Sequence, residues 1–197
     1  MKPRTATIKR KTKETDISGK LVIDGSGKTD IDTGIGFLDH MLELFTFHGL
    51  FDLKLKVRGD LKVDRHHTNE DIGICLGRAF KDALKDFKGI KRYGSAEIPM
   101  DEARAKVVID ISNRYAFKKP TIKLSEAAAE GYSIAEGIDF LDSFAKNLMI
   151  NLHIDMISIG DMHHSLEAIF KAFGIALDQA TQIEPRRKDI PSTKGIL

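Results

Sequence analysis

Four stretches of the chain repeat apolar residues every three or four positions, which is the spacing that gives a helix one apolar face. Two of them are GFLDHMLELF at 36–45 and DFLDSFAKNL at 139–148. The other two follow the motif HHxxE, which occurs at 66–70 and again at 163–167. The pattern therefore predicts four amphipathic helices.

Between the helices of each pair, apolar and polar residues alternate, as they do in a strand with one buried face. These segments are FDLKLKV at 51–57 and NLHIDMISI at 151–159. Further strand candidates lie ahead of them at TATIKRKT, KLVID, ARAKVVIDI and YAFKK. The sequence thus predicts a similar succession of strands and helices in each half.

The two HHxxE motifs lie 97 residues apart, close to half of the 197-residue chain, and the apolar residues behind them keep this offset. The two earlier helices align with an offset of 103, which pairs Met41 with Phe144. We infer an internal duplication and an α+β fold class. Two similar half-domains, residues 1–90 and 91–197, would each form a mostly antiparallel sheet with helices on one face, packed to share a core.

Each HHxxE motif offers one clamp for a cation, because residues four apart stand over one another on a helix. The pairs that this spacing brings together are His66 with Glu70 and His163 with Glu167. The adjacent histidines, His67 and His164, project about 100° away around the turn and cannot join that clamp. They need a second metal, another segment or another subunit.

A histidine pair at the start of a helix can also be a cap and a polar surface patch, and a single copy would leave both interpretations open. Two copies in one register favour the metal. His40 and His153 add candidate ligands, and their counterparts in the other half are Ser143 and Lys56 by the offsets above. Imidazole and carboxylate donors suit manganese, iron or zinc, and spacing does not choose among them.

Composition narrows the partners. The net charge is +2 and the basic residues are scattered, so we expect no nucleic-acid partner. The one cysteine, Cys75, excludes an internal disulfide and suits a packed core thiol. No apolar run has the length of a membrane span, and the start lacks the apolar segment of a signal peptide. We therefore expect a cytoplasmic protein with no membrane partner.

Short segments along nearly the whole chain form a specific set. They are TKET at 12–15, GIGFLDHML at 34–42, DRHHTNEDIG at 64–73, RYG at 92–94, PMDEA at 99–103, HHSLEAIFKAF at 163–173 and PSTKGIL at 191–197. In this order and spacing they resemble the imidazoleglycerol-phosphate dehydratase family of histidine biosynthesis. No single segment decides the resemblance, but their succession is highly specific.

The resemblance implies two duplicated units, each with a four-stranded sheet and two helices. It also implies a homo-oligomer of twenty-four chains, with active sites between subunits that hold two manganese(II) ions. Carried over position by position, the metal ligands would be His40, His66, His67, Glu70, His153, His163, His164 and Glu167. Each copy of HHxxE would then supply half of a dinuclear site.

The reaction implied by the resemblance is dehydration of imidazole glycerol phosphate to imidazole acetol phosphate. The proton to be removed lies next to no carbonyl, so the imidazole ring must accept the electrons. A metal-bound imidazolate could expel the neighbouring hydroxyl and pass through a diazafulvene-like intermediate to an enol and then the ketone. Glu14 is the general acid/base candidate by resemblance, and Glu167 is counted with it as catalytic.

The phosphate of the substrate needs cationic donors. The resemblance assigns substrate and phosphate binding to Glu14, Arg92, Arg114, Lys171, Ser192 and Lys194. Without it, Lys171 would count as a salt-bridge partner of Glu167, and the tail STKG would count as disordered. We expect the tail to close over an anion and to become ordered only when one binds.

Some positions depart from the usual family pattern. Asn113 and Tyr115 flank Arg114 where glycine and proline are commoner, and Asp161 stands where an asparagine usually precedes the second histidine pair. The first change bears on the placement of Arg114. The second bears on hydrogen bonding around the metals.

Two other functions suit the same residues. A dinuclear metallohydrolase acting on a phosphorylated small molecule would use the ligands to make hydroxide, and it would release phosphate. A metal-storage or metal-assembled scaffold would also need many histidines, but it would not need the cationic set of Arg92, Arg114, Lys171 and Lys194. Some relatives are fused to a phosphatase, whereas here we expect the dehydratase activity alone.

Overall fold

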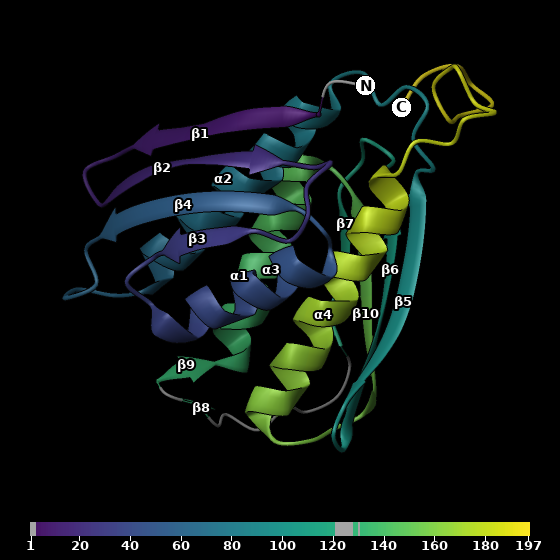
Figure 1. Cartoon of the computed structure of the whole chain (residues 1–197). Coiled ribbons are helices and arrows are strands. Elements are labelled where there is room, and N and C mark those ends of the chain that lie inside the picture. The colour runs from purple at the N-terminus through teal and green to yellow at the C-terminus, as the bar shows by residue number, and fades with distance from the viewer. Residues whose placement is uncertain (1–2, 121–127, 130) are drawn as a thin grey trace.

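A computed structural model describes residues 3–120, 128, 129 and 131–197. The first part of the chain forms a four-stranded sheet and two helices (Figure 1). Its elements are β1 (Thr5–Lys11), β2 (Thr15–Val22), β3 (Thr29–Asp32), α1 (Gly36–His48), β4 (Asp52–Gly59) and α2 (His66–Leu84). The strand order is β1-β2-β4-β3, antiparallel except that β3 runs parallel to β4.

The second part repeats this plan. Its elements are β5 (Tyr93–Met100), β6 (Ala103–Asp110), β7 (Ala116–Lys118), β8 (Ala128–Ala129), β9 (Tyr132–Ser133), α3 (Ile134–Leu148), β10 (Asn151–Ser158) and α4 (Met162–Thr181). The strand order is β5-β6-β10-β7, with β7 parallel to β10, and β8 pairs separately with β9. The predicted α+β class with duplicated half-domains is confirmed. The division between residues 90 and 91 lies in the connection from α2 to β5 and stays a prediction.

The strands β4 and β10 fix the register of the duplication. Both have eight residues, they begin 99 residues apart, and each takes the same place in its sheet. The predicted helix offset of 103 is therefore wrong by one turn. The offset came from aligning the apolar residues of the two helices. Because these residues recur about every four positions, an alignment shifted by four residues fits almost equally well. The corrected counterparts are Asp139 for His40, in place of Ser143, and Lys54 for His153, in place of Lys56.

Two close helix crossings support the corrected register. A β-carbon on Gly77 of α2 would collide with the carbonyl oxygen of Phe144 in α3, and one on Gly174 of α4 would collide with that of Phe45 in α1. The two glycines are 97 residues apart and the two phenylalanines 99 apart. The α2–α3 and α4–α1 pairs therefore cross at equivalent residues, where only glycine admits the neighbouring backbone.

The four helices lie between the two sheets (Figure 1). Phe45 of α1 stacks on Phe173 of α4 with 5.0 Å between ring centroids, and Phe144 of α3 meets Phe80 of α2 at 5.4 Å. All four rings are buried. Because each contact joins a helix of one half to a helix of the other, the halves share one core, as predicted.

The helix α3 begins at Ile134, five residues before the predicted start at 139. A capping box explains the extension. The Ser133 hydroxyl accepts a hydrogen bond of 3.2 Å from the backbone N–H of Glu136, and the Glu136 carboxylate accepts one of 2.7 Å from the backbone N–H of Ser133. Apolar periodicity alone does not detect such a polar first turn. In the described ranges, no helix is long and apolar enough to cross a membrane.

Candidate active site

The second HHxxE motif opens helix α4. The carboxylate of Asp161 caps the helix by accepting a hydrogen bond of 2.8 Å from the backbone N–H of His164. The first helical turn then holds His163 over Glu167, with 3.1 Å between Nε2 of the histidine and Oε1 of the glutamate. The i, i+4 pair that the sequence predicted is therefore present. Asp161 caps the helix, which is a role that an asparagine at this position could also perform.

His40, from α1, completes a cluster with this pair. Its Nε2 lies 2.9 Å from Oε1 of Glu167, and its ring centroid lies 5.6 Å from that of His163. The ring of Phe37 packs edge-on against His163 at 5.1 Å and so restricts it. One ligand atom from each of His40, His163 and Glu167 lies within 4.8 Å of the others. Two imidazoles and a carboxylate at this spacing fit a divalent manganese, iron or zinc ion.

Lys171 controls the charge of this cluster. The side chain of Glu167 is only 9% exposed, and burial by itself would raise its pKa. Hydrogen bonds with Lys171, at 2.6 Å, and with His40 outweigh burial and lower the pKa to about 2. Lys171 is thus the salt-bridge partner that helix spacing predicts. It keeps the carboxylate in the deprotonated form that binds a cation.

The first HHxxE motif opens α2 in a more exposed setting. His66 and Glu70 are exposed, whereas His67 is half-buried, with its Nδ1 3.3 Å from Oδ2 of Asp60 and 4.0 Å from Oε2 of Glu14. The hydrogen bond with Asp60, followed by the charge of Glu14, raises the pKa of His67. The structure thus brings Glu14 beside a predicted ligand. Sequence reasoning missed Asp60, which follows β4 without a motif.

A partly buried network fixes the turn that carries Glu14. The carboxylate of Asp71 accepts hydrogen bonds from Nε of Arg10 at 2.9 Å and from the hydroxyl of Thr15 at 2.5 Å. Asp71 follows Glu70 on α2, and Thr15 follows Glu14 at the start of β2. The acid/base candidate is therefore attached to the motif helix through its neighbour.

The outward histidine of the second copy, His164, faces the turn between β5 and β6. Its Nδ1 lies 3.1 Å from Oε2 of Glu102, and its Nε2 lies 3.6 Å from Oδ2 of Asp101. The hydrogen bond with Glu102 is the main cause that raises the pKa of His164. These three residues form a second group with ligand atoms within 4.8 Å of one another. The sequence placed both acids in PMDEA, but no role was assigned to them.

Two further residues lie outside these groups. His153 is exposed on β10, opposite Val108 of β6 and Lys118 of β7. Asp139, the corrected counterpart of His40, is exposed on α3. Its partial burial raises its pKa.

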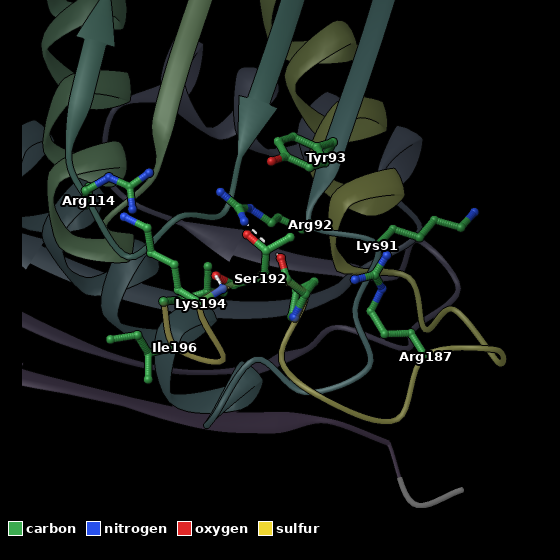
Figure 2. A pocket seen from close by; sticks show the side chains of 11 residues that line it. Lys91, Arg92, Tyr93, Arg114, Arg187, Ser192, Lys194 and Ile196 are labelled. Carbon is green, nitrogen blue, oxygen red and sulfur yellow. Dashed lines mark hydrogen bonds between the residues drawn. The ribbon is translucent and has the colours of Figure 1, made fainter.

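A cavity of about 500 Å³ lies beside the C-terminal tail (Figure 2). Five cationic side chains and two tail hydroxyls line it: Lys91, Arg92, Arg114, Arg187, Lys194, Ser192 and Thr193. In the described part of the chain, no aspartate or glutamate lines it. Four of the predicted phosphate-binding residues thus meet here, whereas Lys171 and Glu14 do not. This anion pocket has the charge that a phosphate requires.

Arg92 connects the pocket to the tail. Its guanidinium donates two hydrogen bonds to Asp110, at 2.6 and 3.0 Å, and a third of 2.9 Å to the carbonyl of Pro191. It also lies over the ring of Tyr93, 4.9 Å from the centroid. Pairing with Asp110 is the largest cause that raises the pKa of Arg92. This arginine therefore holds the tail against the second sheet.

The structure explains why Asn113 and Tyr115, which differ from the usual family pattern, are tolerated beside Arg114. Asn113 has φ of +52°, a left-handed conformation that asparagine tolerates better than most residues other than glycine. Its side-chain amide donates a hydrogen bond of 3.1 Å to the carbonyl of Leu197. The hydroxyl of Tyr115 donates to Asp142. Arg114 still lines the pocket, and Asn113 adds a contact to the C-terminal residue.

The cluster of His40, His163 and Glu167 and the anion pocket lie toward opposite ends of α4. Glu167 is near the start of the helix, whereas the backbone N–H of Arg92 donates to the carbonyl of Ala180 near its end. These two helix residues are 13 positions apart, which corresponds to about 20 Å along the axis. A small phosphorylated substrate cannot reach both places within one chain.

Comparison with known proteins decides the family. A family model described as imidazoleglycerol-phosphate dehydratase matches residues 33–177. The chain belongs to the imidazoleglycerol-phosphate dehydratase family. The imidazoleglycerol-phosphate dehydratase of Geobacillus sp. (strain WCH70) is 52% identical over 194 residues, covering 98% of this chain and 99% of that protein. That of Bacillus subtilis (strain 168) is 52% identical over 198 residues, covering 98% of this chain and 100% of that protein.

Two crystal structures of imidazoleglycerol-phosphate dehydratases are similar in fold. The enzyme from Staphylococcus aureus subsp. aureus N315 aligns with a TM-score of 0.80 and 37% identity over 91% of this chain and 100% of that one. The Pyrococcus furiosus enzyme, in complex with (S)-C348, aligns with a TM-score of 0.81 and 36% identity over 96% and 100%. The chain is therefore a hydro-lyase of histidine biosynthesis, and the hydrolase and scaffold alternatives lose their support.

Proposed function

We propose that this imidazoleglycerol-phosphate dehydratase depends on metal and that its active site holds two manganese(II) ions. The observation that carries the proposal is the convergence of His40, His163 and Glu167 from helices of different halves. Oxygen and nitrogen donors around an ionised carboxylate are the set that such an ion requires. The proposed ligands are those that the resemblance to the family implies: His40, His66, His67, Glu70, His153, His163, His164 and Glu167.

The bound cations would supply positive charge beside the imidazole of the substrate, which favours loss of its N–H proton. Electrons of the ring can then expel the neighbouring hydroxyl. Protonated Glu14 gives its proton to that hydroxyl, which leaves as water, and the resulting carboxylate takes the next C–H proton to give the enol, which becomes the ketone. The position of Glu14, 4.0 Å from His67, supports this role.

The anion pocket would hold the phosphate of the substrate. Arg114, Lys194 and Ser192 offer donors there, and Arg92 braces the wall through Asp110. Figure 2 shows Arg114 and Lys194 on one side of Ser192, with Lys91 and Arg187 on the other. A phosphate between them would draw the two sides together, which supports the expected ordering of the tail on anion binding.

The site is proposed to be shared between chains of a homo-oligomer of twenty-four subunits. The separation of about 20 Å along α4 supports sharing, because phosphate in the pocket of one chain leaves its imidazole far from Glu167 of that chain. A neighbouring chain would bring its own histidine cluster to the pocket. We also propose that the enzyme is located in the cytoplasm, which agrees with its role in biosynthesis.

Manganese-loaded protein incubated with imidazole glycerol phosphate tests the proposal. The expected products are the ketone, with no free phosphate, and activity that disappears with a chelator and returns with manganese(II). Release of inorganic phosphate would indicate hydrolysis instead. Full activity in the presence of excess chelator, with metal shown to be absent, would contradict the metal dependence.

A further inference from the structure

The tail, residues 191–197, is attached to the rest of the chain at both of its ends. At its start, the carbonyl of Pro191 accepts a hydrogen bond of 2.9 Å from the guanidinium of Arg92. At its end, the carbonyl of Leu197 accepts one of 3.1 Å from the side-chain amide of Asn113. The side chain of Leu197 also packs against the hydrophobic core. The tail therefore spans two fixed points beside the anion pocket.

A compact turn lies between these two attachments. The backbone N–H of Gly195 donates a hydrogen bond of 3.0 Å to the carbonyl of Ser192, and the backbone N–H of Lys194 donates one of 3.2 Å to the Ser192 hydroxyl. Both Ser192 and Lys194 line the pocket. Because the turn is short and internally bonded, the two attachments decide where these side chains stand.

The attachment at Leu197 depends on a lysine from the first half-domain. Nζ of Lys81, half-buried in the last turn of α2, donates a hydrogen bond of 3.2 Å to the side-chain oxygen of Asn113. An ammonium group only donates and a carbonyl only accepts, so the amide oxygen must face Lys81 and the NH₂ group must face Leu197. A reversed amide would lose both bonds. Lys81 thus sets the orientation of the amide that holds the tail.

The same junction carries a second wall of the pocket. Asn113 lies between Ser112 and Arg114 in one tight turn, where the buried Ser112 hydroxyl donates a hydrogen bond of 3.2 Å to the carbonyl of Arg114. That hydroxyl also accepts one of 3.3 Å from the backbone N–H of Arg114. Figure 2 shows Arg114 and Lys194 on the same side of Ser192. One amide therefore relates the arginine of this turn to the lysine of the tail.

We propose that Lys81 is a positioning residue for the phosphate of the substrate and that it acts through Asn113. In the part of the chain that the structure describes, Lys81 does not itself line the pocket. Its hydrogen bond holds the tail in place before the anion arrives, so less conformational freedom is lost on binding and the affinity is higher. The inference rests on the phosphate site put forward under the proposed function.

Phosphate binding by the intact, manganese-loaded oligomer tests this inference. Inorganic phosphate is the probe, calorimetry gives its dissociation constant, and the binding that Arg114→Ala abolishes is assigned to the pocket. Lys81→Met should weaken that binding by about 2- to 10-fold and raise the KM for imidazole glycerol phosphate by a similar factor, with kcat and metal content little changed. Lys81→Arg keeps a donor and should behave nearly as wild type. The matched control, Lys85→Met, replaces an exposed lysine four positions further on and should change neither constant.

A double variant separates positioning from a direct effect of charge. If Lys81 acts by orienting the amide of Asn113, adding Lys81→Met to Asn113→Gly should cause no further loss of phosphate affinity. An equal loss in both backgrounds would show that the charge of Lys81 acts on the phosphate directly, and would overturn the inference.

The remaining outcomes separate the two claims. An unchanged dissociation constant in Lys81→Met, with wild type binding phosphate in the pocket, would overturn the role of Lys81 and leave the proposed phosphate site standing. Phosphate binding that is the same in wild type and Arg114→Ala would overturn the proposed phosphate site, and this inference with it.

Discussion

Nε2 of His40 lies 2.9 Å from Oε1 of Glu167, although 127 residues separate them in the sequence. The contact joins the first half-domain to the second at the point where a cation would sit. Replacing Glu167 with glutamine keeps the shape of the side chain and removes its charge. We predict that Glu167→Gln loses about one metal ion per chain and at least about 100-fold in turnover.

Elemental analysis and the dehydratase assay check this prediction together. Glu43→Gln is the matched control, because Glu43 lies on α1 but is exposed and outside the cluster. It should retain metal and activity. A Glu167→Gln protein that keeps its full metal content would contradict the assignment of Glu167 as a ligand.

The lowered pKa of Glu167 predicts how stability depends on pH in the metal-free protein. The pKa of Glu167 in the folded protein is about 2, below the ordinary value of 4.5. Ionised Glu167 therefore stabilises the folded state fully at pH values above about 4.5. That contribution is lost as the pH falls from about 4.5 to about 2. Denaturant unfolding at a series of pH values in chelator should show a decline in the free energy of unfolding over this range.

Two substitutions isolate the origin of this decline. In Glu167→Gln, the part of the decline in the free energy of unfolding that comes from this carboxylate should be absent. In Lys171→Met the decline should be smaller, because Lys171 is the main group that lowers the pKa of Glu167. Lys146→Met, an exposed lysine on α3, should behave as wild type. An unchanged pH profile in Glu167→Gln would show that the carboxylate does not carry this effect.

The two arginines of the anion pocket should behave differently when removed. Arg114→Ala and Arg92→Ala should each reduce kcat/KM by about 10- to 100-fold, the worth of a charged hydrogen bond, with metal content unchanged. Arg92→Ala should also lower the free energy of unfolding by about 1–3 kcal/mol, because Asp110 loses its bidentate partner. Arg114 is exposed and should have no such effect.

Steady-state kinetics and denaturant unfolding separate these effects, with Arg104→Ala on β6 as an exposed control. Equal kcat/KM values in wild type and Arg114→Ala would place the phosphate elsewhere.

Asn113 provides a test of the tail. Its amide donates to the carbonyl of Leu197, and its φ of +52° suits glycine. Asn113→Gly removes this hydrogen bond and the one of 3.2 Å that the side-chain oxygen accepts from Nζ of Lys81. It should raise the KM for imidazole glycerol phosphate by about 2- to 10-fold, with kcat little changed, because the contact with the tail is lost. Lys85→Gly relieves another left-handed residue, φ +56°, without touching the tail. A KM that rises equally in both variants would indicate a general effect of glycine.

The sequence predicted those parts of the fold that depend on local periodicity. The HHxxE helices follow from a three-and-four repeat, and β4 and β10 follow from alternation. The strands β3 and β5 were not predicted, because β3 is short and polar and β5 contains Gly94 and Pro99. Both are edge strands, where such residues are tolerated.

The site was predictable where one helix carries both partners, as with His163 and Glu167. Asp60 and Glu102 were missed for a different reason. Each approaches a histidine of another element through the tertiary fold, and a lone acid beside a strand has no local pattern to mark it.

Mixed assemblies test the shared active site most directly. The Glu167→Gln protein and the Arg92→Ala/Arg114→Ala double variant, each nearly inactive alone, are co-expressed with different affinity tags, and oligomers that carry both tags are purified. If the metal cluster and the anion pocket of one site come from different chains, some sites receive both intact parts, and activity should return to about a quarter of the wild-type value at equal mixing. If one chain supplied both parts, every site would carry a defect, and mixed oligomers without activity would contradict the account.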